Sequence, residues 1–153
     1  MTRRAAAPSS TLPFSKILVP VDKSENANRA LEYALKLSMF TKCEMMVLHV
    51  LQDIQYSEES YLYIRELEDS LEKHAKKYLD ELVNKIEKEH GIKLKAIVKR
   101  GGPVSGIMDT VKEENIDLIV MGSRGLGGFK EMLLGSVSHG VTSHAKVPVL
   151  IVK

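Results

Sequence analysis

The sequence predicts an α/β domain built on a doubly wound parallel sheet, and three observations lead to this fold class. Short apolar runs rich in β-branched residues alternate along the chain with longer segments of helical period. Most of these runs are apolar almost throughout, as in strands that helices cover on both faces. No internal repeat interrupts the alternation. The resulting order βαβαβαβαβ implies right-handed crossovers and a ligand crevice at the carboxyl ends of the strands, where the strand order reverses.

Five segments are expected to form the strands. Four of them are nearly continuous apolar runs, which suits a sheet buried between two helix layers. The remaining one alternates, with Leu94, Ala96 and Val98 facing one way and lysines the other. That pattern is typical of an edge strand half exposed to water, and the lysine row is interpreted as a solvated edge rather than a nucleic-acid patch. The strands are predicted at residues 17–19, 45–51, 93–99, 118–121 and 147–152.

Four segments of helical period lie between the strands. The first follows Ser24, a residue type that caps helix N-termini, and the third follows Pro103. The second lies in the long charged stretch 58–90, which is interpreted as one or two amphipathic helices with solvated outer faces. The fourth spans residues 137–145. The tyrosines at the start of the second segment are expected to flank the ligand or a partner: Tyr56, Tyr61 and Tyr63.

The bulk composition is that of one ordinary globular domain, expected at residues 15–153 after a disordered leader at residues 1–14. Lysine and arginine number 22 against 20 acidic residues, too near balance to indicate nucleic acid or an acidic membrane as partner. Cys43 is the only cysteine, so no internal disulfide can form, which favours a cytoplasmic location. No apolar run suits a signal peptide or a membrane span.

Residues 122–136 have the character of a phosphate-binding cradle. Four glycines in seven residues, at positions 122, 125, 127 and 128, allow backbone N–H groups to converge without obstruction by Cβ atoms. The N-terminus of the last predicted helix follows and adds unpaired donors and a partial positive charge. Arg124 adds a charged donor, and the Ser136 hydroxyl is expected to cap the helix or to bond a phosphate oxygen.

Other phosphate and nucleophile motifs are absent. The segment lacks the Gly-Lys-Ser/Thr of a P-loop, and Lys130 stands where a dinucleotide fingerprint needs its third glycine. Met121 likewise breaks the Gly-x-Ser-x-Gly elbow around Ser123. Asp22 follows the first strand and faces the same crevice, where capping of the next helix and contact with a ligand are equally good interpretations.

These features together resemble the universal stress protein family, specifically its ATP-binding branch. The pattern G-x2-G-x9-G-S/T is met by Gly122, Gly125, Gly135 and Ser136, directly after the strand that ends at Met121. The start Ile-Leu-Val-Pro-Val-Asp-x-Ser at residues 17–24 and the ending Val-Pro-Val-Leu-Ile-Val at residues 147–152 also look like the family. The resemblance covers residues 16–153.

The resemblance implies a five-stranded sheet of order 3-2-1-4-5, a Rossmann-like or adenine nucleotide alpha hydrolase-like fold, and a homodimer through the C-terminal strand. It also implies ATP with Mg2+ or Mn2+ bridging the phosphates, adenine held by the backbone near Val50, and phosphates held by the glycine segment. The nucleotide-binding residues it implies are Pro20, Val21, Asp22, Val50, Met121, Gly122, Arg124, Gly125, Gly135, Ser136 and Val137.

The function expected from these residues is that of a nucleotide-binding regulatory module. No general base or catalytic lysine accompanies the cradle, so hydrolysis of ATP is expected to be slow at most. The alternative is a slow ATPase or an adenylating enzyme on the same fold, although the glycine-serine and His-x-Gly-His signatures of such enzymes are missing. A flavin-type electron carrier is a third reading, and a 5% aromatic content without tryptophan weakens it.

Histidines and methionines are not expected to bind metal. Only His139 and His144 lie close in sequence, and a spacing of five puts them on different faces of a helix. His49, on a predicted buried strand, is interpreted as a hydrogen-bonded core histidine. The methionines are interpreted as packing residues.

Overall fold

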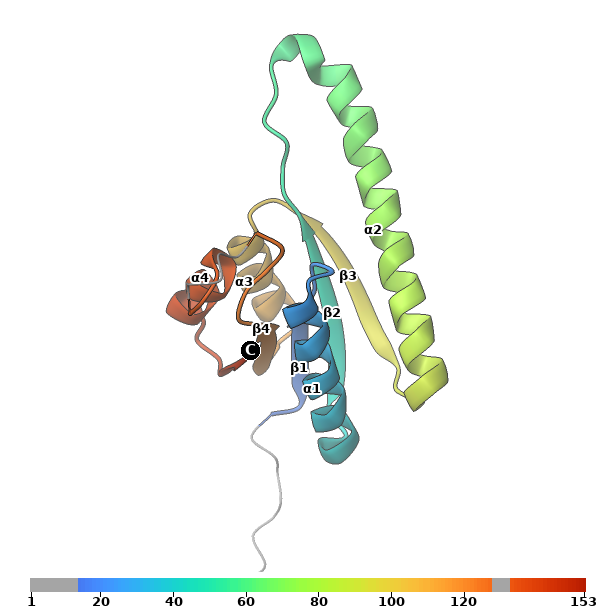
Figure 1. Cartoon of the computed structure of the whole chain (residues 1–153), viewed down its shortest axis with the longest axis vertical. Coiled ribbons are helices and arrows are strands. Elements are labelled where there is room, and N and C mark those ends of the chain that lie inside the picture. Colours follow the sequence, from blue (N-terminus) through green and yellow to red (C-terminus); the bar gives the residue numbers. More distant parts are fainter. Residues whose placement is uncertain (1–13, 128–132) are drawn as a thin grey trace, which may run out of the picture.

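The computed structural model describes residues 14–127 and 133–153, which fold around a five-stranded parallel sheet of order β3-β2-β1-β4-β5 (Figure 1). The predicted fold class and strand order are therefore confirmed. The elements are β1 (Lys16–Pro20), α1 (Glu25–Thr41), β2 (Glu44–Leu51), the 3-10 turn η1 (Glu58–Ser60), α2 (Tyr61–His90), β3 (Leu94–Arg100), α3 (Pro103–Glu113), β4 (Leu118–Gly122), α4 (Ser136–His144) and β5 (Val149–Val152).

Two helix layers cover the sheet, which explains why its central strands are apolar throughout. Ile17, Leu18 and Val19 are all fully buried, although successive side chains of a strand point to opposite faces. Ile17 and Val19 belong to a core under α1 and α2 that also contains Leu79. Leu18 belongs to a second core under α3 and α4, together with Ile107. Apolar residues are therefore required at the three central positions of β1.

The helix ends follow local sequence signals. Ser24 accepts a hydrogen bond from Ala27 N at 3.1 Å, so it caps α1 as predicted. Gly91 ends α2 in the left-handed conformation, with φ of 66°. Pro103 occupies the first turn of α3, where its missing N–H costs nothing. None of the helices in residues 14–127 and 133–153 has the length and apolar content to cross a bilayer.

β3 is an edge strand, as predicted, but its lysines are not simply solvated. Lys95 Nζ lies 2.7 Å from the Glu114 carboxylate, and Lys99 Nζ lies 2.6 Å from that of Glu113, both at the end of α3. The predicted alternation is also incomplete, because Ala96 is exposed while Leu94 and Val98 pack against the core. The charges of Lys95 and Lys99 on this edge are therefore neutralised by ion pairs within the chain.

The other sheet edge is β5, which is shorter than the predicted segment 147–152. Pro148 precedes the strand, and its carbonyl accepts a hydrogen bond from Ile119 N at 3.0 Å. Because proline has no N–H to donate to a ladder, regular pairing with β4 starts only at Val149. In residues 14–127 and 133–153 no further strand pairs with the outer side of β5.

The start of the described chain is tied to the loop before β4. Phe14, the last residue of the expected leader, packs against the core, and residues 1–13 lie outside the described residues. The Asp117 carboxylate accepts hydrogen bonds from Ser15 N, Ser15 Oγ and Lys16 N at 2.7–2.9 Å. Burial alone would raise the pKa of Asp117, but these hydrogen bonds outweigh it and lower the pKa below its ordinary value.

The position of β1 decides where a ligand can enter. The chain runs outward from β1 to β2 and β3, and then returns to form β4 on the other side of β1. The loops after β1 and β4 therefore diverge to opposite faces of the sheet and leave a crevice between the carboxyl ends of these strands.

Candidate functional site

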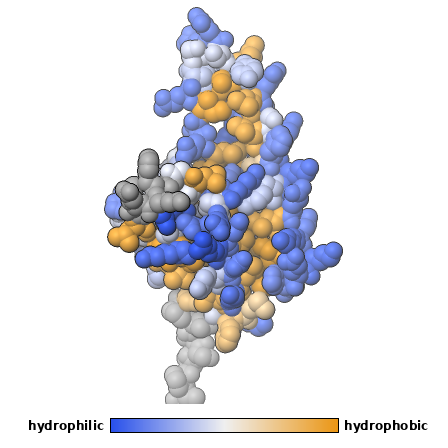
Figure 2. Space-filling model, in the orientation of Figure 1, coloured by the Kyte–Doolittle hydropathy of each residue, from blue (hydrophilic) through white to orange (hydrophobic). Residues whose placement is uncertain are grey.

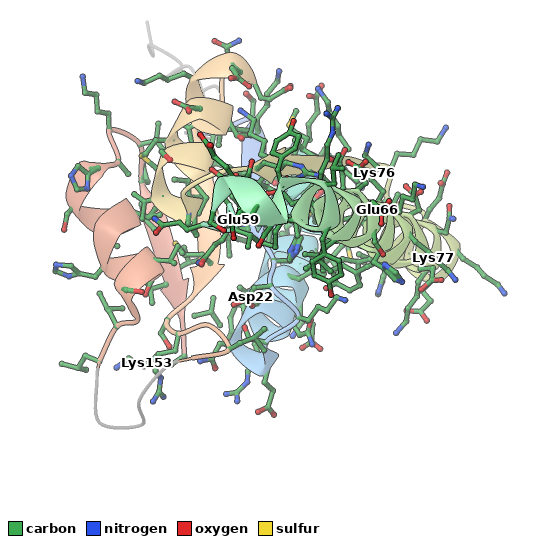
Figure 3. All side chains as sticks on the ribbon, turned by 90° about the horizontal axis from the view of Figure 1, so that it is seen from above. Asp22, Glu59, Glu66, Lys76, Lys77 and Lys153 are labelled. Atoms are coloured by element: carbon green, nitrogen blue, oxygen red, sulfur yellow. The ribbon has the colours of Figure 1, made fainter. Side chains whose placement is uncertain are left out.

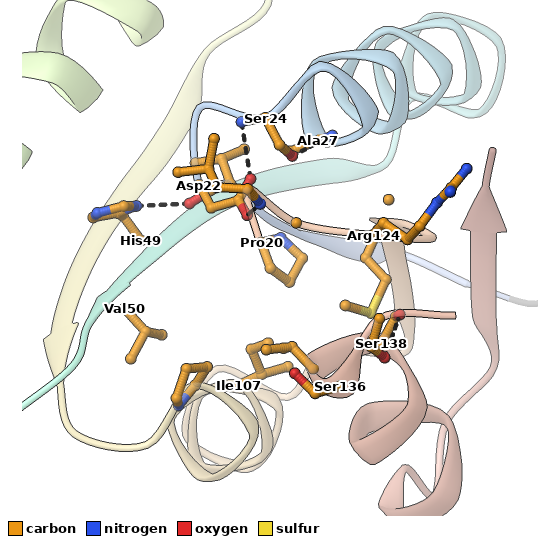
Figure 4. A pocket seen from close by; sticks show the side chains of 18 of the residues that line it. Pro20, Asp22, Ser24, Ala27, His49, Val50, Ile107, Arg124, Ser136 and Ser138 are labelled. Carbon is orange, nitrogen blue, oxygen red and sulfur yellow. Dashed lines mark hydrogen bonds between the residues drawn. The ribbon is translucent and has the colours of Figure 1, made fainter. Parts of the chain in front are cut away.

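A pocket of about 580 Å3 occupies the crevice at the carboxyl ends of β1, β2 and β4 (Figure 4). Its walls also include the start of α3 and the start of α4. The structure brings together there every residue that the sequence predicted as a nucleotide contact: Pro20, Val21, Asp22, Val50, Met121, Gly122, Arg124, Gly125, Gly135, Ser136 and Val137. Residues 128–132 of the predicted cradle lie outside the described residues.

One end of the pocket is apolar. Val50 at the end of β2 and Ile107 of α3 lie near each other on this side, as Figure 4 shows, and Pro103 adds the first turn of α3. Gly106 allows the close approach of α3, because a Cβ at this position would lie only 3.1 Å from Val50 Cγ2. The sequence did not identify Pro103 and Ile107 as site residues. Pro103 indicated only the start of a helix, and the helical period at Ile107 indicated only core packing.

The glycine segment reaches the pocket from β4, but two of its glycines serve packing. A Cβ on Gly122 would lie 2.7 Å from Asn26 C and 2.9 Å from Ala27 N, in the first turn of α1. A Cβ on Gly125 would lie 2.5 Å from Asp22 Oδ2. Of the glycines in the described ranges, only Gly91 and Gly101 have positive φ, so close approach rather than unusual backbone geometry explains this segment.

Asp22 links the loop after β1 to the loop after β4. Its Oδ1 accepts a hydrogen bond from Ser24 N at 3.0 Å, and its Oδ2 accepts one from Leu126 N at 3.3 Å. The first bond forms a turn that leads into α1, with Lys23 at φ of 66°. The second holds the glycine segment beside the pocket. Asp22 thus has a structural role and a place in the pocket wall at the same time.

The N-terminus of α4 presents donors to the pocket. The N-cap is Gly135, which has no side chain to bond the first N–H groups of the helix, and Ser136 is the first helical residue. Capping of α4 by Ser136, one of its two expected roles, is therefore wrong. In the first turn of a helix the N–H groups have no intrahelical acceptor. Nothing within the described ranges accepts a hydrogen bond from Ser136 N or Val137 N.

Ser138 fastens this helix start to the glycine segment. Its Oγ lies 2.6 Å from Ser123 O and 3.0 Å from Gly135 O, and it donates one proton between them. Gly135 N donates a second bond to Ser123 O at 2.7 Å. The two donor groups, the glycine segment and the start of α4, are therefore held in one fixed arrangement before any ligand arrives.

His49 is a pocket residue whose position the sequence did not reveal. Its Nδ1 donates to Val21 O at 2.7 Å, so the expected hydrogen bond is confirmed, but the expected core position is wrong because His49 is half-buried in the pocket wall. Its ring meets Tyr78 edge-on at 6.2 Å between centroids, and Lys23 Nζ lies 4.7 Å from the centre of the Tyr78 ring. Burial, and then the charge of Asp22, raise the pKa of Tyr78. The sequence feature that could have identified His49 as a site residue is its polar side chain near the end of an apolar strand.

The pocket suits one class of ligand. Apolar walls at one end accept a flat, weakly polar group, and the helix N-terminus and glycine segment at the other end accept an anion. No three His, Cys, Asp or Glu side chains in the described part of the chain are arranged to hold a metal ion.

Comparisons with known proteins agree with this picture. The model of the universal stress protein family matches residues 13–153. The chain is 37% identical over 150 residues to universal stress protein YxiE of Bacillus subtilis. The alignment covers 92% of this chain and 99% of that protein. Universal stress protein UspA from Lactobacillus plantarum superposes with a TM-score of 0.85 at 27% identity, covering 93% of this chain and 99% of the other. A universal stress protein family protein of Arabidopsis thaliana, solved with AMP bound, has a TM-score of 0.64 at 30% identity, covering 91% of each chain.

Proposed function

Since this chain belongs to the universal stress protein family, we propose that it is a regulatory protein that binds ATP in the pocket at the ends of β1 and β4. One observation carries the proposal: an apolar end near Val50 and the glycine-capped start of α4 line the same pocket. The first would hold adenine and the second the phosphates. The relative solved with AMP supports a nucleotide as the ligand class.

Two separate donor groups favour a ligand with several phosphates. The N–H groups of Ser136 and Val137 point from a helix start, and the N–H groups of Gly125 and Gly127 would supply a second set beside Gly135, since those of Ser123 and Leu126 are bonded to Val152 O and Asp22. A monophosphate would engage one of these sets, whereas a triphosphate is long enough to engage both. Mg2+ or Mn2+ would be held by the phosphate oxygens, and such an ion would neutralise charge between them.

Binding without rapid hydrolysis is part of the proposal. Among the described pocket residues, Asp22 and His49 are the side chains able to take a proton from water. Both oxygens of Asp22 already accept bonds from backbone N–H groups, whereas His49 donates its Nδ1–H to Val21 O and keeps Nε2 able to accept a proton. His49 Nε2 is thus the remaining candidate base, and the chain supplies no catalytic lysine beside it in the described pocket. We infer that ATP serves as a signal that a partner detects, in a cytoplasmic protein, and no observation favours an adenylating enzyme or a flavin carrier.

Nucleotide binding can be tested on the purified protein. With ATP and Mg2+ at about a hundred times the dissociation constant, binding adds about 2.7 kcal/mol to the free energy of unfolding. The thermal midpoint should then rise by roughly 5–10 °C, and chelation of Mg2+ should reduce the rise. Mass spectrometry of the denatured protein should identify any nucleotide that copurifies. If ATP and ADP leave the midpoint unchanged at millimolar concentration and no nucleotide copurifies, the proposal fails.

We also propose a homodimer through β5. Val149 and Ile151 pack against the core, while Leu150 is 38% exposed on a strand with an unpaired edge. An apolar edge strand is an aggregation hazard unless another chain covers it. Leu150→Lys should give monomer or insoluble protein, because a lysine would be buried in the interface. Phe40→Lys, at the exposed end of α1, is the matched control. An unchanged dimer of Leu150→Lys by light scattering would exclude this interface.

A further inference from the structure

The long helix α2 extends well beyond the sheet. Its 30 residues span about 45 Å, whereas the 7 residues of β3, against which it packs, span about 23 Å. The excess projects past the carboxyl ends of the strands, together with η1 and the segment that leads up from β2 (Figure 1). The pocket lies at the same end of the sheet. We call residues 53–71 of this projection the α2 tip.

The apolar stripe of α2 continues into the α2 tip, where the described residues cover it only in part. Leu79, in the lower half, is 1% exposed against the sheet, whereas Leu71 and Leu67 on the same stripe are 41% and 38% exposed. Leu62 and Tyr63 near the start of the helix are 75% and 71% exposed. Figure 2 shows apolar side chains gathered on the projecting part of the molecule. The stripe therefore has the pattern of a core face without a core beneath it.

The α2 tip is held in place and is not a frayed end. Arg100, at the end of β3, pairs with Glu68 at 3.1 Å, Asp69 at 3.7 Å and Glu72 at 2.9 Å. Tyr61 adds contacts within the projection, because its ring lies 5.9 Å from that of Tyr56 and its hydroxyl accepts a bond from Arg65. A surface fixed in this way costs a partner little ordering entropy on binding.

The charge of the α2 tip indicates what could cover it. From Asp53 to Glu72 the chain carries seven carboxylates and one arginine, in a protein of net charge +2. In the described part of the chain, four of these carboxylates take part in no ion pair, and Figure 3 labels two of them, Glu59 and Glu66, at this end of the molecule. The other two are Asp53 and Glu58. Two copies of this surface would repel each other, and so would an anionic membrane.

We propose that the α2 tip is a docking surface for a basic amphipathic segment of a partner protein. The apolar side of that segment packs on Leu67 and Leu71, and its lysines or arginines meet the carboxylates that flank the stripe. The exposed tyrosines Tyr56, Tyr61 and Tyr63 provide ring faces for arginine. This inference goes beyond nucleotide binding and does not require an occupied pocket.

The probe for this surface is a fluorescent amphipathic peptide with leucines at helical spacing flanked by arginines. Anisotropy titration of the full chain should give saturable binding that weakens with salt. Leu67→Ser combined with Leu71→Ser should weaken binding at least tenfold. Phe40→Ser, which removes a side chain that is 93% exposed elsewhere, should leave it unchanged. Glu58→Gln with Glu59→Gln and Glu66→Gln should weaken binding and flatten its salt dependence. Circular dichroism checks that each variant is folded.

Several outcomes would overturn the docking proposal. It fails if the peptide does not bind, if a scrambled peptide of the same composition binds equally well, or if a version with glutamates in place of arginines does so. It also fails if the Leu67→Ser and Leu71→Ser double variant binds like the parent. Loss of self-association in that variant by light scattering would make a second copy the occupant. Tip-dependent binding to phosphatidylserine vesicles would assign the surface to membranes instead.

Discussion

Replacing Gly135 with valine is expected to weaken ATP binding by roughly two to four orders of magnitude while the protein stays folded. A Cβ at this position would lie 3.3 Å from Arg124 Cα and 3.6 Å from Gly125 N, between the two donor groups of the pocket. The γ-methyl groups of valine would then occupy the space proposed for the phosphates. Each lost backbone bond to a charged group is worth about 1.5–3 kcal/mol, and loss of two gives the stated factor. Isothermal titration measures it.

The control for Gly135→Val is Arg124→Ala, which removes one charge from the pocket wall without adding atoms near the backbone. It should weaken ATP binding only modestly. Gly125→Val is a less clean test, because its Cβ would displace the Asp22 carboxylate and so break the bond to Leu126 N. A folded Gly135→Val variant that binds ATP like the parent would contradict the assignment of the phosphates to this end of the pocket.

Gly122→Val should instead destabilise the fold, by about 3 kcal/mol or more in the free energy of unfolding. Its Cβ would lie within 3 Å of backbone atoms of Asn26 and Ala27, and the start of α1 cannot move without losing its Ser24 cap. Overpacking against a well-packed core typically costs about 1–3 kcal/mol, and here the obstructing atoms are backbone. Urea unfolding followed by circular dichroism measures the change.

Gly127→Val is the matched control for stability, because no atom of the described residues lies within 4 Å of a Cβ on Gly127. It should unfold within about 0.5 kcal/mol of the parent, as for a surface substitution. Equal stability of the Gly122→Val and Gly127→Val variants would show that the contact between β4 and α1 is not as close as the structure has it. Comparing the stabilities of these two variants therefore distinguishes a glycine that packing requires from one that only lies in the same loop.

The strands and helices could be predicted because their signals are local. Continuous burial of Ile17, Leu18 and Val19 follows from covered faces, and the cap at Ser24 and the proline at the start of α3 are read from single residues. Boundaries were less accurate. β5 begins after Pro148 and not before it, because proline cannot donate to the ladder.

Many of the residues that line the candidate site could also be predicted from the sequence. The glycine-rich run that starts at Gly122 and the helix start that follows it indicated a phosphate cradle. Gly122, Gly125, Gly135 and Ser136, which also carry the family resemblance, all line the pocket. The reason for each glycine was not predictable. Gly122 and Gly125 are required by α1 and Asp22, which are about a hundred residues away in sequence, so only the folded chain shows what a Cβ would meet.

By itself the sequence determined the sheet, its helix layers, the family and the residues at the carboxyl ends of β1 and β4, because periodicity and short motifs encode neighbours along the chain. Only the tertiary structure decided that Ile107 would wall the pocket, that Ser138 would fasten α4 to the glycine segment, and that the stripe of Leu67 and Leu71 would emerge uncovered. These features depend on where each helix or strand ends relative to its neighbours in the folded chain. The same apolar period is buried beside β3 and exposed beyond its end, and no local pattern distinguishes the two.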